Sequence, residues 1–239
     1  MTAATLQYSA PQSVSVWTGA DMLERDRLRI VLATIAINVA AVALLTLAPW
    51  SNWRTATSLN LVDNTLLLGF VLMRRDRLLA KLMAFGLAAG IGELGADAWL
   101  VDFTRTLDYS SGGGPMLWRS PLWMPFAWEV VAVQFGYLGL RLRQRYGAWG
   151  LLLIGVLGAI NIPYYEEMAR RIHWWHYSGC RMLSFTPWYI IVGEFGIAIV
   201  LTLLVRPLRD RGALTAVGLG IVAAVGIFVC YALAYAVIE

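Results

Sequence analysis

The chain has 239 residues, of which 59% are hydrophobic and only 14% are charged, with a mean hydropathy of +0.64. A soluble domain of this length needs more polar surface, so the composition indicates a protein that crosses a bilayer several times. The net charge of +4 does not indicate nucleic-acid binding, because the basic residues stand singly or in short groups between apolar segments. Cys180 and Cys230 form no disulfide framework and no metal spacing. They could pair only if the loop near Cys180 folds onto the last apolar segment.

Residues 1–29 are predicted to form a cytoplasmic tail that ends in a short interfacial helix. Residues 1–20 are polar and lack the apolar core of a signal peptide. Thr18 and Asp21 fit a capping box, with Trp17 as the preceding apolar staple.

Seven apolar segments follow, each long enough for a membrane helix, which needs about 20 residues. They are predicted at residues 30–50, 56–73, 78–101, 121–141, 147–165, 186–205 and 213–237. Residues 30–239 are therefore predicted to be an all-α integral membrane domain of seven transmembrane helices. The second segment is the weakest, because it contains Asn60, Asp63 and Asn64.

Lys and Arg residues orient this predicted bundle, because they concentrate on the cytoplasmic side of membrane proteins. Thirteen of the nineteen basic residues fall on one side: Arg25, Arg27, Arg29, Arg74, Arg75, Arg77, Lys81, Arg141, Arg143, Arg145, Arg206, Arg209 and Arg211. The N-terminus is therefore predicted inside and the C-terminus outside, with the long loops 102–120 and 166–185 facing outward. We expect a location in the cytoplasmic membrane of a bacterium.

Six carboxylates lie in or at the ends of these segments, and a carboxylate at membrane depth is a functional-site candidate by default. The predicted catalytic residues are Glu93, Asp97, Glu129, Glu166, Glu167 and Glu194. At a rise of 1.5 Å per residue, all of them fall in the outer half of the bilayer. Glu129 and Glu194 lie deepest in otherwise apolar sequence, about two turns in, and are predicted to be the principal acids.

Structural explanations of the other acids stay open. Glu93 and Asp97 share a helix face and could cap the polar end of their helix. Glu166 and Glu167 could be solvated residues that pair with arginines at helical spacing. Asp63, with its neighbouring asparagines, is interpreted as an interhelical hydrogen-bonding group.

An internal repeat links the two deepest acids. A Trp stands six residues before Glu129 and before Glu194, in similar sequences that each begin a predicted span. The shared features are Tyr109, Met116-Leu117 and Trp123 in one unit, and Tyr177, Met182-Leu183 and Trp188 in the other. We interpret residues 78–141 and 147–205 as two copies of one helix-pair unit. Repeats in membrane proteins commonly place a site at their interface.

No metal or cofactor is predicted. His173 and His176, even with the nearby Glu166 and Glu167, fall short of the three or more well-spaced ligands that zinc or iron sites usually need. The run Gly112-Gly113-Gly114 is not a phosphate cradle, because no Lys and no helix start follow it.

Several segments resemble the carotenoid biosynthesis membrane family that includes bisanhydrobacterioruberin hydratase. The resemblance is carried by Gly92-Glu93-Leu94-Gly95, Tyr109, Gly114-Pro115-Met116-Leu117 and residues 121–128. The segment Pro163-Tyr164-Tyr165-Glu166-Glu167 is similar to the Pro-x-Glu-Glu motif of heterodimer-type lycopene cyclases. The more distantly similar fungal membrane terpene cyclases are also seven-span proteins. The resemblance implies acid-initiated chemistry on isoprenoid double bonds without a cofactor or metal, in a protein that could form homo- or hetero-oligomers.

The expected function is therefore an intramembrane isoprenoid cyclase that protonates an alkene or epoxide with a carboxylic acid. Burial and a neighbouring carboxylate both help an acid to keep its proton at neutral pH. Aromatic faces stabilise the resulting carbocation; the predicted lining is Trp99, Tyr109, Trp123, Trp128, Tyr177 and Trp188. The substrate is expected to be a lipophilic isoprenoid that enters from the bilayer. The alternatives are a hydratase of the same family, a proton-coupled transporter and a non-catalytic membrane scaffold.

Overall fold

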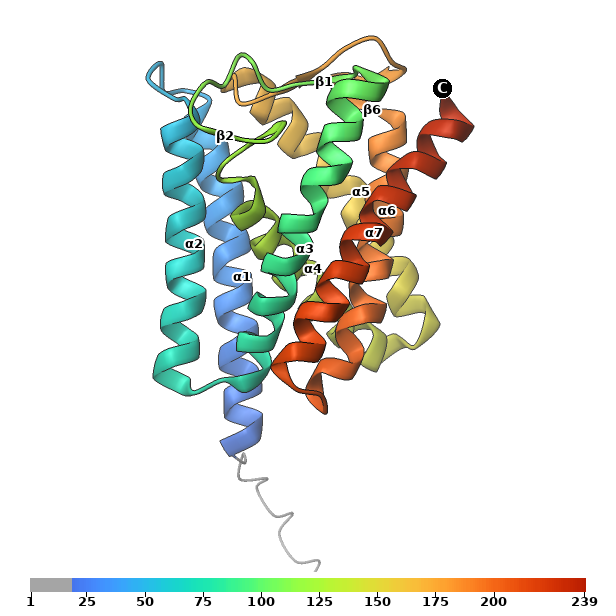
Figure 1. The fold of residues 1–239 in the computed structure, drawn as a ribbon. Helices are drawn as coiled ribbons and strands as arrows, with labels where there is room; N and C mark the ends of the chain where they lie inside the picture. The colour runs from blue at the N-terminus through green and yellow to red at the C-terminus, as the bar shows by residue number, and fades with distance from the viewer. Residues whose placement is uncertain (1–18) are drawn as a thin grey trace, which may run out of the picture.

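The computed structural model describes residues 19–239, which fold into a bundle of seven long helices (Figure 1). They are α1 (Gly19–Leu45), α2 (Trp53–Arg74), α3 (Arg77–Ala98), α4 (Met124–Tyr146), α5 (Ala148–Arg171), α6 (Trp188–Val205) and α7 (Ala213–Ile238). A π-helical segment, η1 (Trp99–Thr104), continues α3, and a 3-10 helix, η2 (Arg206–Arg209), follows α6. Each of the seven predicted apolar spans coincides with one of these helices, but residues 46–50, 121–123, 147 and 186–187 of the predicted spans lie outside them.

Six of the helices in residues 19–239 are long and apolar enough to cross a membrane. Among the described long helices, α4 is the exception, because polar residues interrupt it at Glu129 and Gln134 and basic residues occupy its last turns. The six apolar helices are compatible with a multi-pass membrane protein.

The start of the bundle differs from the prediction. The sequence predicts a separate interfacial helix before residue 30, whereas residues from Gly19 onward belong to one continuous helix, α1. The predicted capping residues Trp17 and Thr18 lie outside the described residues. Arg27 explains the continuity, because it forms a buried ion pair with Asp76 at the start of α3 and so holds the charged end of α1 against the bundle.

Helices α3 to α7 pack closely with one another, and α1 and α2 form a hairpin at the side of this group (Figure 1). Small residues bring α3 and α7 together. A side chain added at Gly220 would meet the backbone oxygen of Phe85 at 2.3 Å, and one added at Gly92 would meet the Cβ of Ala224 at 2.5 Å. Because α3 and α7 are in such close contact, α3 cannot slide far along α7, and the positions of Glu93 and Asp97 along the bundle are fixed.

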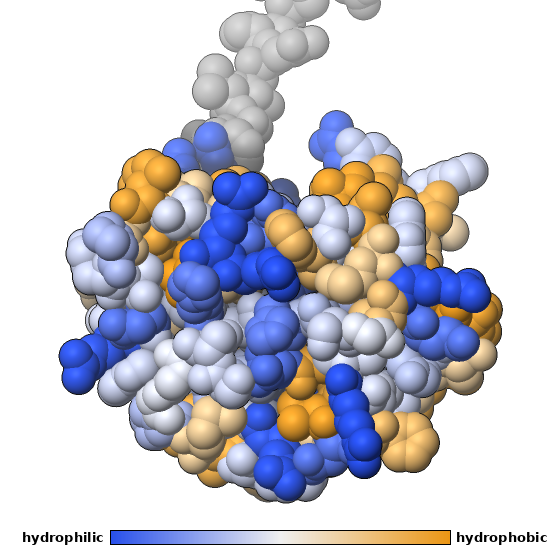
Figure 2. All heavy atoms as spheres, turned by 90° about the horizontal axis from the view of Figure 1, so that it is seen from above, coloured by the Kyte–Doolittle hydropathy of each residue, from blue (hydrophilic) through white to orange (hydrophobic). Residues whose placement is uncertain are grey.

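The two long loops meet at the end of the bundle opposite the start of α1 (Figure 1). Their strands are β1 (Leu107–Asp108), β2 (Met116–Leu117), β3 (Ser120–Pro121), β4 (His176–Tyr177), β5 (Met182–Leu183) and β6 (Thr186–Pro187). β1 pairs antiparallel with β4 and thereby joins one loop to the other. Hydrophilic residues cover much of this end, and hydrophobic residues gather mainly towards its rim (Figure 2).

Each loop also contains a hairpin of the same form. Met116 pairs with Pro121 in one hairpin, and Met182 pairs with Pro187 in the other. Both hairpins turn at a non-glycine residue in the left-handed region, at Trp118 (φ 58°) and Ser184 (φ 56°). The two Met-Leu pairs of the predicted repeat therefore have the same local structure.

Candidate functional site

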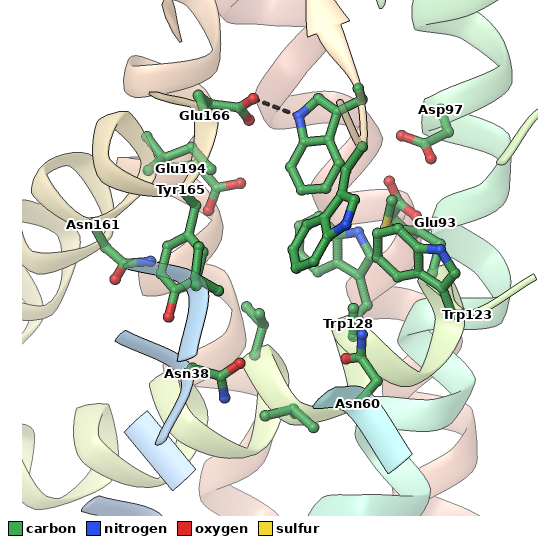
Figure 3. A pocket seen from close by; sticks show the side chains of 18 of the residues that line it. Asn38, Asn60, Glu93, Asp97, Trp123, Trp128, Asn161, Tyr165, Glu166 and Glu194 are labelled. Carbon is green, nitrogen blue, oxygen red and sulfur yellow. Dashed lines mark hydrogen bonds between the residues drawn. The ribbon is translucent and has the colours of Figure 1, made fainter. Parts of the chain in front are cut away.

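A cavity of about 150 Å³ lies within the bundle, beneath the joined loops. Carboxylates, tryptophans and tyrosines line it next to the loops, and carboxamides line its other end (Figure 3). Four of the six predicted acids reach it: Glu93, Asp97, Glu166 and Glu194. The predicted aromatic residues that reach it are Tyr109, Trp123, Trp128 and Tyr177.

Two of these acids come from α3. Glu93 and Asp97 are one helical turn apart and face the same cavity. Asp97 Oδ2 accepts hydrogen bonds from Tyr109 Oη and Ser120 Oγ, each at 2.7 Å. In contrast, Glu93 Oε2 has no hydrogen-bond partner among the described residues, although the residue is only 1% exposed. The two neighbouring carboxyls therefore differ: Asp97 is held by two donors, whereas one oxygen of Glu93 is buried without a partner.

The other two acids come from α5 and α6, and each is oriented by an aromatic donor. Trp175 Nε1 donates to Glu166 Oε2 at 2.5 Å. Tyr231 Oη of α7 donates to Glu194 Oε1 at 2.5 Å. Buried polar groups need such partners, so these bonds fix where the two carboxyls point.

Aromatic rings form one wall of the cavity. The rings of Trp123, Trp174 and Trp175 lie with centroids 5.9–6.1 Å apart, and Tyr109 makes an edge contact with Trp175 at 6.2 Å. Burial raises the pKa of Tyr109 and of Tyr177 well above the usual range, and the charge of Asp97 adds to this for Tyr109. Both phenols therefore keep their protons at neutral pH and can act as hydrogen-bond donors.

Two predicted acids do not line the cavity. Glu129 is buried at 5% exposure, but it lies outside the lining, and its backbone oxygen packs against Gly86 of α3. Glu167 lies at the surface, where it accepts hydrogen bonds from Arg171 and Ser184. The pairing of Glu167 with Arg171 is the arginine pairing at helical spacing that the sequence offers as an alternative explanation of this acid.

Two predicted aromatic residues also lie elsewhere. Trp99 packs edge-on against Phe228 and Tyr235 of α7, so it contributes to helix packing. Trp188 is 42% exposed on the outside of the bundle. Trp188 is the first residue of α6.

Other cavity residues are missing from the sequence prediction. Tyr231 lies in an apolar helix whose glycines suggest packing alone, and Trp174 and Trp175 belong to the His-Trp-Trp-His segment. In that segment Nε2 of His176 lies 3.6 Å from Oδ2 of Asp108, and neither residue lines the cavity. Within residues 19–239, no group of three or more His, Cys, Asp or Glu side chains is arranged to hold a metal ion. Both cysteines are free thiols.

The carboxamides at the other end come from four helices: Asn38, Asn60, Gln134 and Asn161. Asn38 Nδ2 donates to Asp63 Oδ2 at 2.7 Å and joins α1 to α2, in agreement with the interhelical role expected for Asp63.

A protein-family model, described as Domain of unknown function (DUF6989), matches residues 94–238, which is more than half of the chain. The chain belongs to the DUF6989 family. The matched segment of this DUF6989 member includes Asp97, Glu166 and Glu194, whereas Glu93 and helices α1 and α2 precede it. No curated protein and no solved structure matches the chain.

Proposed function

We propose that this DUF6989 member is an intramembrane isoprenoid cyclase that starts its reaction by protonating an alkene or epoxide with a buried carboxylic acid. One observation carries the proposal: a cavity inside a bundle of apolar helices combines four carboxyls with a wall of aromatic rings. Carboxyls at such depth are costly to maintain, so a chemical use for them is the default explanation.

Glu93 is the proposed proton donor. Its side chain lines the cavity, and its Oε2 has no hydrogen-bond partner among the described residues. Asp97, which accepts two hydrogen bonds, is better suited to stay ionised and stabilise positive charge nearby. This division of roles follows the rule that paired carboxyls in different surroundings act as acid and as charge stabiliser.

The reaction balances without a cofactor. The carboxyl proton adds to one carbon of a double bond and leaves a cation on the other carbon; in an epoxide it adds to the oxygen, and one C–O bond then breaks to give a hydroxyl group and a cation on the released carbon. The π electrons of a second double bond attack that carbon and close a ring. A proton then leaves the new cation for a carboxylate base, for which Glu194 and Glu166 are the candidates across the cavity (Figure 3). The rings of Trp123 and Trp175 stabilise the cation through cation–π attraction and exclude water.

The proposed topology has all seven helices crossing the bilayer, with the start of α1 on the cytoplasmic side. The α2–α3, α4–α5 and α6–α7 connections then carry their basic residues on that side. Helix α4 crosses despite its polar residues because it packs against α3, α5 and α6. This placement puts the four cavity acids near the outer surface, and the proposed location is the cytoplasmic membrane of a bacterium.

In this topology the substrate enters the cavity from the surrounding lipid. A smaller apolar cavity between α1, α4 and α5 shares Gln134, Phe135, Asn161 and Tyr165 with the main one. Its wall includes Leu157, which is 46% exposed on the outer face of α5. An isoprenoid chain can therefore reach the acids from the bilayer without an aqueous channel.

The test is conversion of a panel of polyprenyl alkenes and terminal epoxides by purified protein in D₂O, with products resolved by mass spectrometry. Wild-type protein is expected to give cyclised products: those from alkenes carry one carbon-bound deuterium from the acid, whereas those from epoxides are recognised by the new ring, because deuterium on their hydroxyl exchanges. Removing a general acid typically costs 10²–10⁴-fold, so Glu93→Gln should lower turnover by about 10² or more. Glu129→Gln, a buried acid outside the cavity, is the matched control and should stay within a few-fold of wild type. Equal activity of the two variants would overturn the assignment of Glu93.

Hydration is the alternative outcome of the same cation, because water can capture it before a ring closes. A parallel reaction in H₂¹⁸O separates the two outcomes. Cyclisation ended by proton loss incorporates no ¹⁸O from solvent, whereas hydration places one labelled oxygen in the product.

A further inference from the structure

The end of the cavity away from the acids is lined by neutral hydrogen-bonding groups. Four carboxamides line the cavity from four different helices: Asn38 of α1, Asn60 of α2, Gln134 of α4 and Asn161 of α5. Asn38 and Asn60 lie away from the acids, and Asn161 lies beside Tyr165 (Figure 3). We propose that this amide end binds a neutral head group containing a hydroxyl or carbonyl oxygen. The substrate is then an oxygenated isoprenoid, neither a pure hydrocarbon nor a diphosphate. The isoprenoid part of this statement rests on the proposed function.

The amide end has hydrogen-bonding capacity that the protein does not use. Asn161 and the Tyr165 hydroxyl have no hydrogen-bond partner among residues 19–239, although both line the cavity. Gln134 donates to Thr34 Oγ1 at 3.1 Å through its nitrogen, which leaves its oxygen available. Asn38 likewise commits its nitrogen, to Thr34 O and to Asp63, and keeps its oxygen.

Such groups are costly at membrane depth unless something satisfies them. Buried polar groups in folded proteins are nearly always hydrogen-bonded, and an unpaired one loses its solvation without compensation. A ligand that both donates and accepts can satisfy Asn161 and Tyr165 together. Carboxamides offer donors and acceptors in one uncharged group, so they match a hydroxyl, ketone, ester or amide.

The charges around the cavity exclude the main alternative, a diphosphate. Of the described residues that line it, none is Lys, Arg or His, and four are acids. Phosphate groups are held by Arg, Lys or helix N-termini, so a diphosphate would meet four acids and no compensating cation among the described lining residues. A hydrocarbon would fit the aromatic wall but would leave the amides unsatisfied.

The two ends also set the direction of the substrate. The head group lies against the amides, and the chain passes the tryptophan wall towards Glu93 and Asp97 (Figure 3). Protonation therefore begins at a double bond or epoxide remote from the head group.

The test measures binding separately from turnover. Purified protein in nanodiscs is titrated with geranylgeraniol, with the C20 hydrocarbon that lacks only its hydroxyl, and with geranylgeranyl diphosphate. Quenching of tryptophan fluorescence is the readout, because Trp123 and Trp175 line the cavity. The alcohol is expected to bind at least about threefold more tightly than the hydrocarbon, the effect of one neutral hydrogen bond, and the diphosphate more weakly still.

Variants at the amide end locate the contact. Asn161→Leu and the milder Tyr165→Phe should each weaken alcohol binding about three- to tenfold and leave hydrocarbon binding unchanged. Asn64→Leu is the matched control, because Asn64 is a carboxamide of α2 that bonds to Asn60 O and Phe126 O outside the cavity lining. Equal binding of alcohol and hydrocarbon, or the same loss in Tyr165→Phe and Asn64→Leu, would overturn the proposal.

The outcome is independent of the acid chemistry. Glu93→Gln should bind the alcohol as wild type does, even where it has lost turnover. If cyclisation fails in every assay and the alcohol preference persists, the amide end stands and the proposed reaction falls. If cyclisation is observed with no alcohol preference, the amide proposal alone is refuted.

Discussion

The carboxylate of Asp76 connects the start of α3 to the start of α1, and Asp76→Ala is predicted to destabilise the protein strongly. Asp76 Oδ1 accepts hydrogen bonds from the backbone N–H groups of Leu78 and Leu79, each at 3.0 Å, and so caps α3. The Arg27 guanidinium donates to both oxygens, from Nε at 2.6 Å and from Nη2 at 3.0 Å. The side chains of Asp76 and Arg27 are 0% and 7% exposed, so water does not screen this pair.

The magnitude follows from these two roles. Loss of a helix N-cap costs about 1 kcal/mol, and removal of one partner from a buried ion pair costs about 3–5 kcal/mol. The two costs overlap, because Glu24 remains to pair with Arg27. We therefore expect Asp76→Ala to lower the free energy of unfolding by about 3–5 kcal/mol. Asp76→Asn retains a capping oxygen and loses only the charge, so its cost should be about 2 kcal/mol.

The assay is equilibrium unfolding of protein in dodecyl maltoside micelles by titration with SDS, followed by far-UV circular dichroism. Asp26→Ala is the matched control, because Asp26 pairs with Arg29 and Arg74 at the same end of the bundle in a more exposed site. Exposed pairs contribute about 0–1 kcal/mol, so the control should shift the transition little. Indistinguishable transitions for Asp76→Ala and Asp26→Ala would refute the reasoning.

Three further perturbations test packing, the site and a thiol. Gly220→Val should destabilise by about 1–3 kcal/mol in the same assay, because the new side chain meets the backbone of α3, whereas Gly218→Val meets no atom within 4 Å and should be neutral. Tyr231→Phe removes the hydrogen bond to Glu194, and we expect turnover to fall about tenfold with little change in the amount of folded protein. Burial raises the pKa of Cys180 to about 11, so its thiolate forms only as the pH approaches that value. Its alkylation by iodoacetamide at pH 8, followed by mass spectrometry, should be slower than that of free cysteine by roughly a hundredfold, and an equal rate would contradict this.

The helices of this fold follow from the sequence because the length of an apolar run is a local property. A run of about 20 residues satisfies its own backbone only as a helix in an apolar surrounding, and each of the seven predicted segments coincides with a helix. The start of α1 does not follow from local sequence, because its charged first turns depend on Arg27 meeting Asp76, which lies on a different helix.

The position of each acid along its helix follows from the sequence, but the direction in which its side chain points does not. Glu129 and Glu194 stand at similar depths, yet only Glu194 lines the cavity. Each acid stands among apolar neighbours in the sequence, so the local pattern does not say which of the two faces a cavity. Partners distant in sequence decide the outcome: Tyr231 of α7 holds Glu194 in the cavity, whereas the backbone of Glu129 packs against Gly86.

The carboxamides of the amide end are not predicted as site residues from the sequence. Asn38, Gln134 and Asn161 are carboxamides in three separate helices, and each alone has an ordinary explanation as an interhelical hydrogen-bonding group. They form a candidate site only because all three line one cavity, which depends on how the helices pack. A search for carboxamides within the predicted spans would have included them.

The α1–α2 hairpin contributes carboxamides to the cavity but none of its four acids. Asp97, Glu166 and Glu194 lie within the DUF6989 segment and are held beneath the joined loops, whereas Asn38 and Asn60 lie on α1 and α2, before that segment. The α1–α2 hairpin packs at the side of the bundle, so a change in it can alter the amide end without moving the acids. Selection of the head group and protonation of the chain are thus separable: substitutions at Asn38 or Asn60 should change which isoprenoid binds, and substitutions at Glu93 should change only whether it reacts.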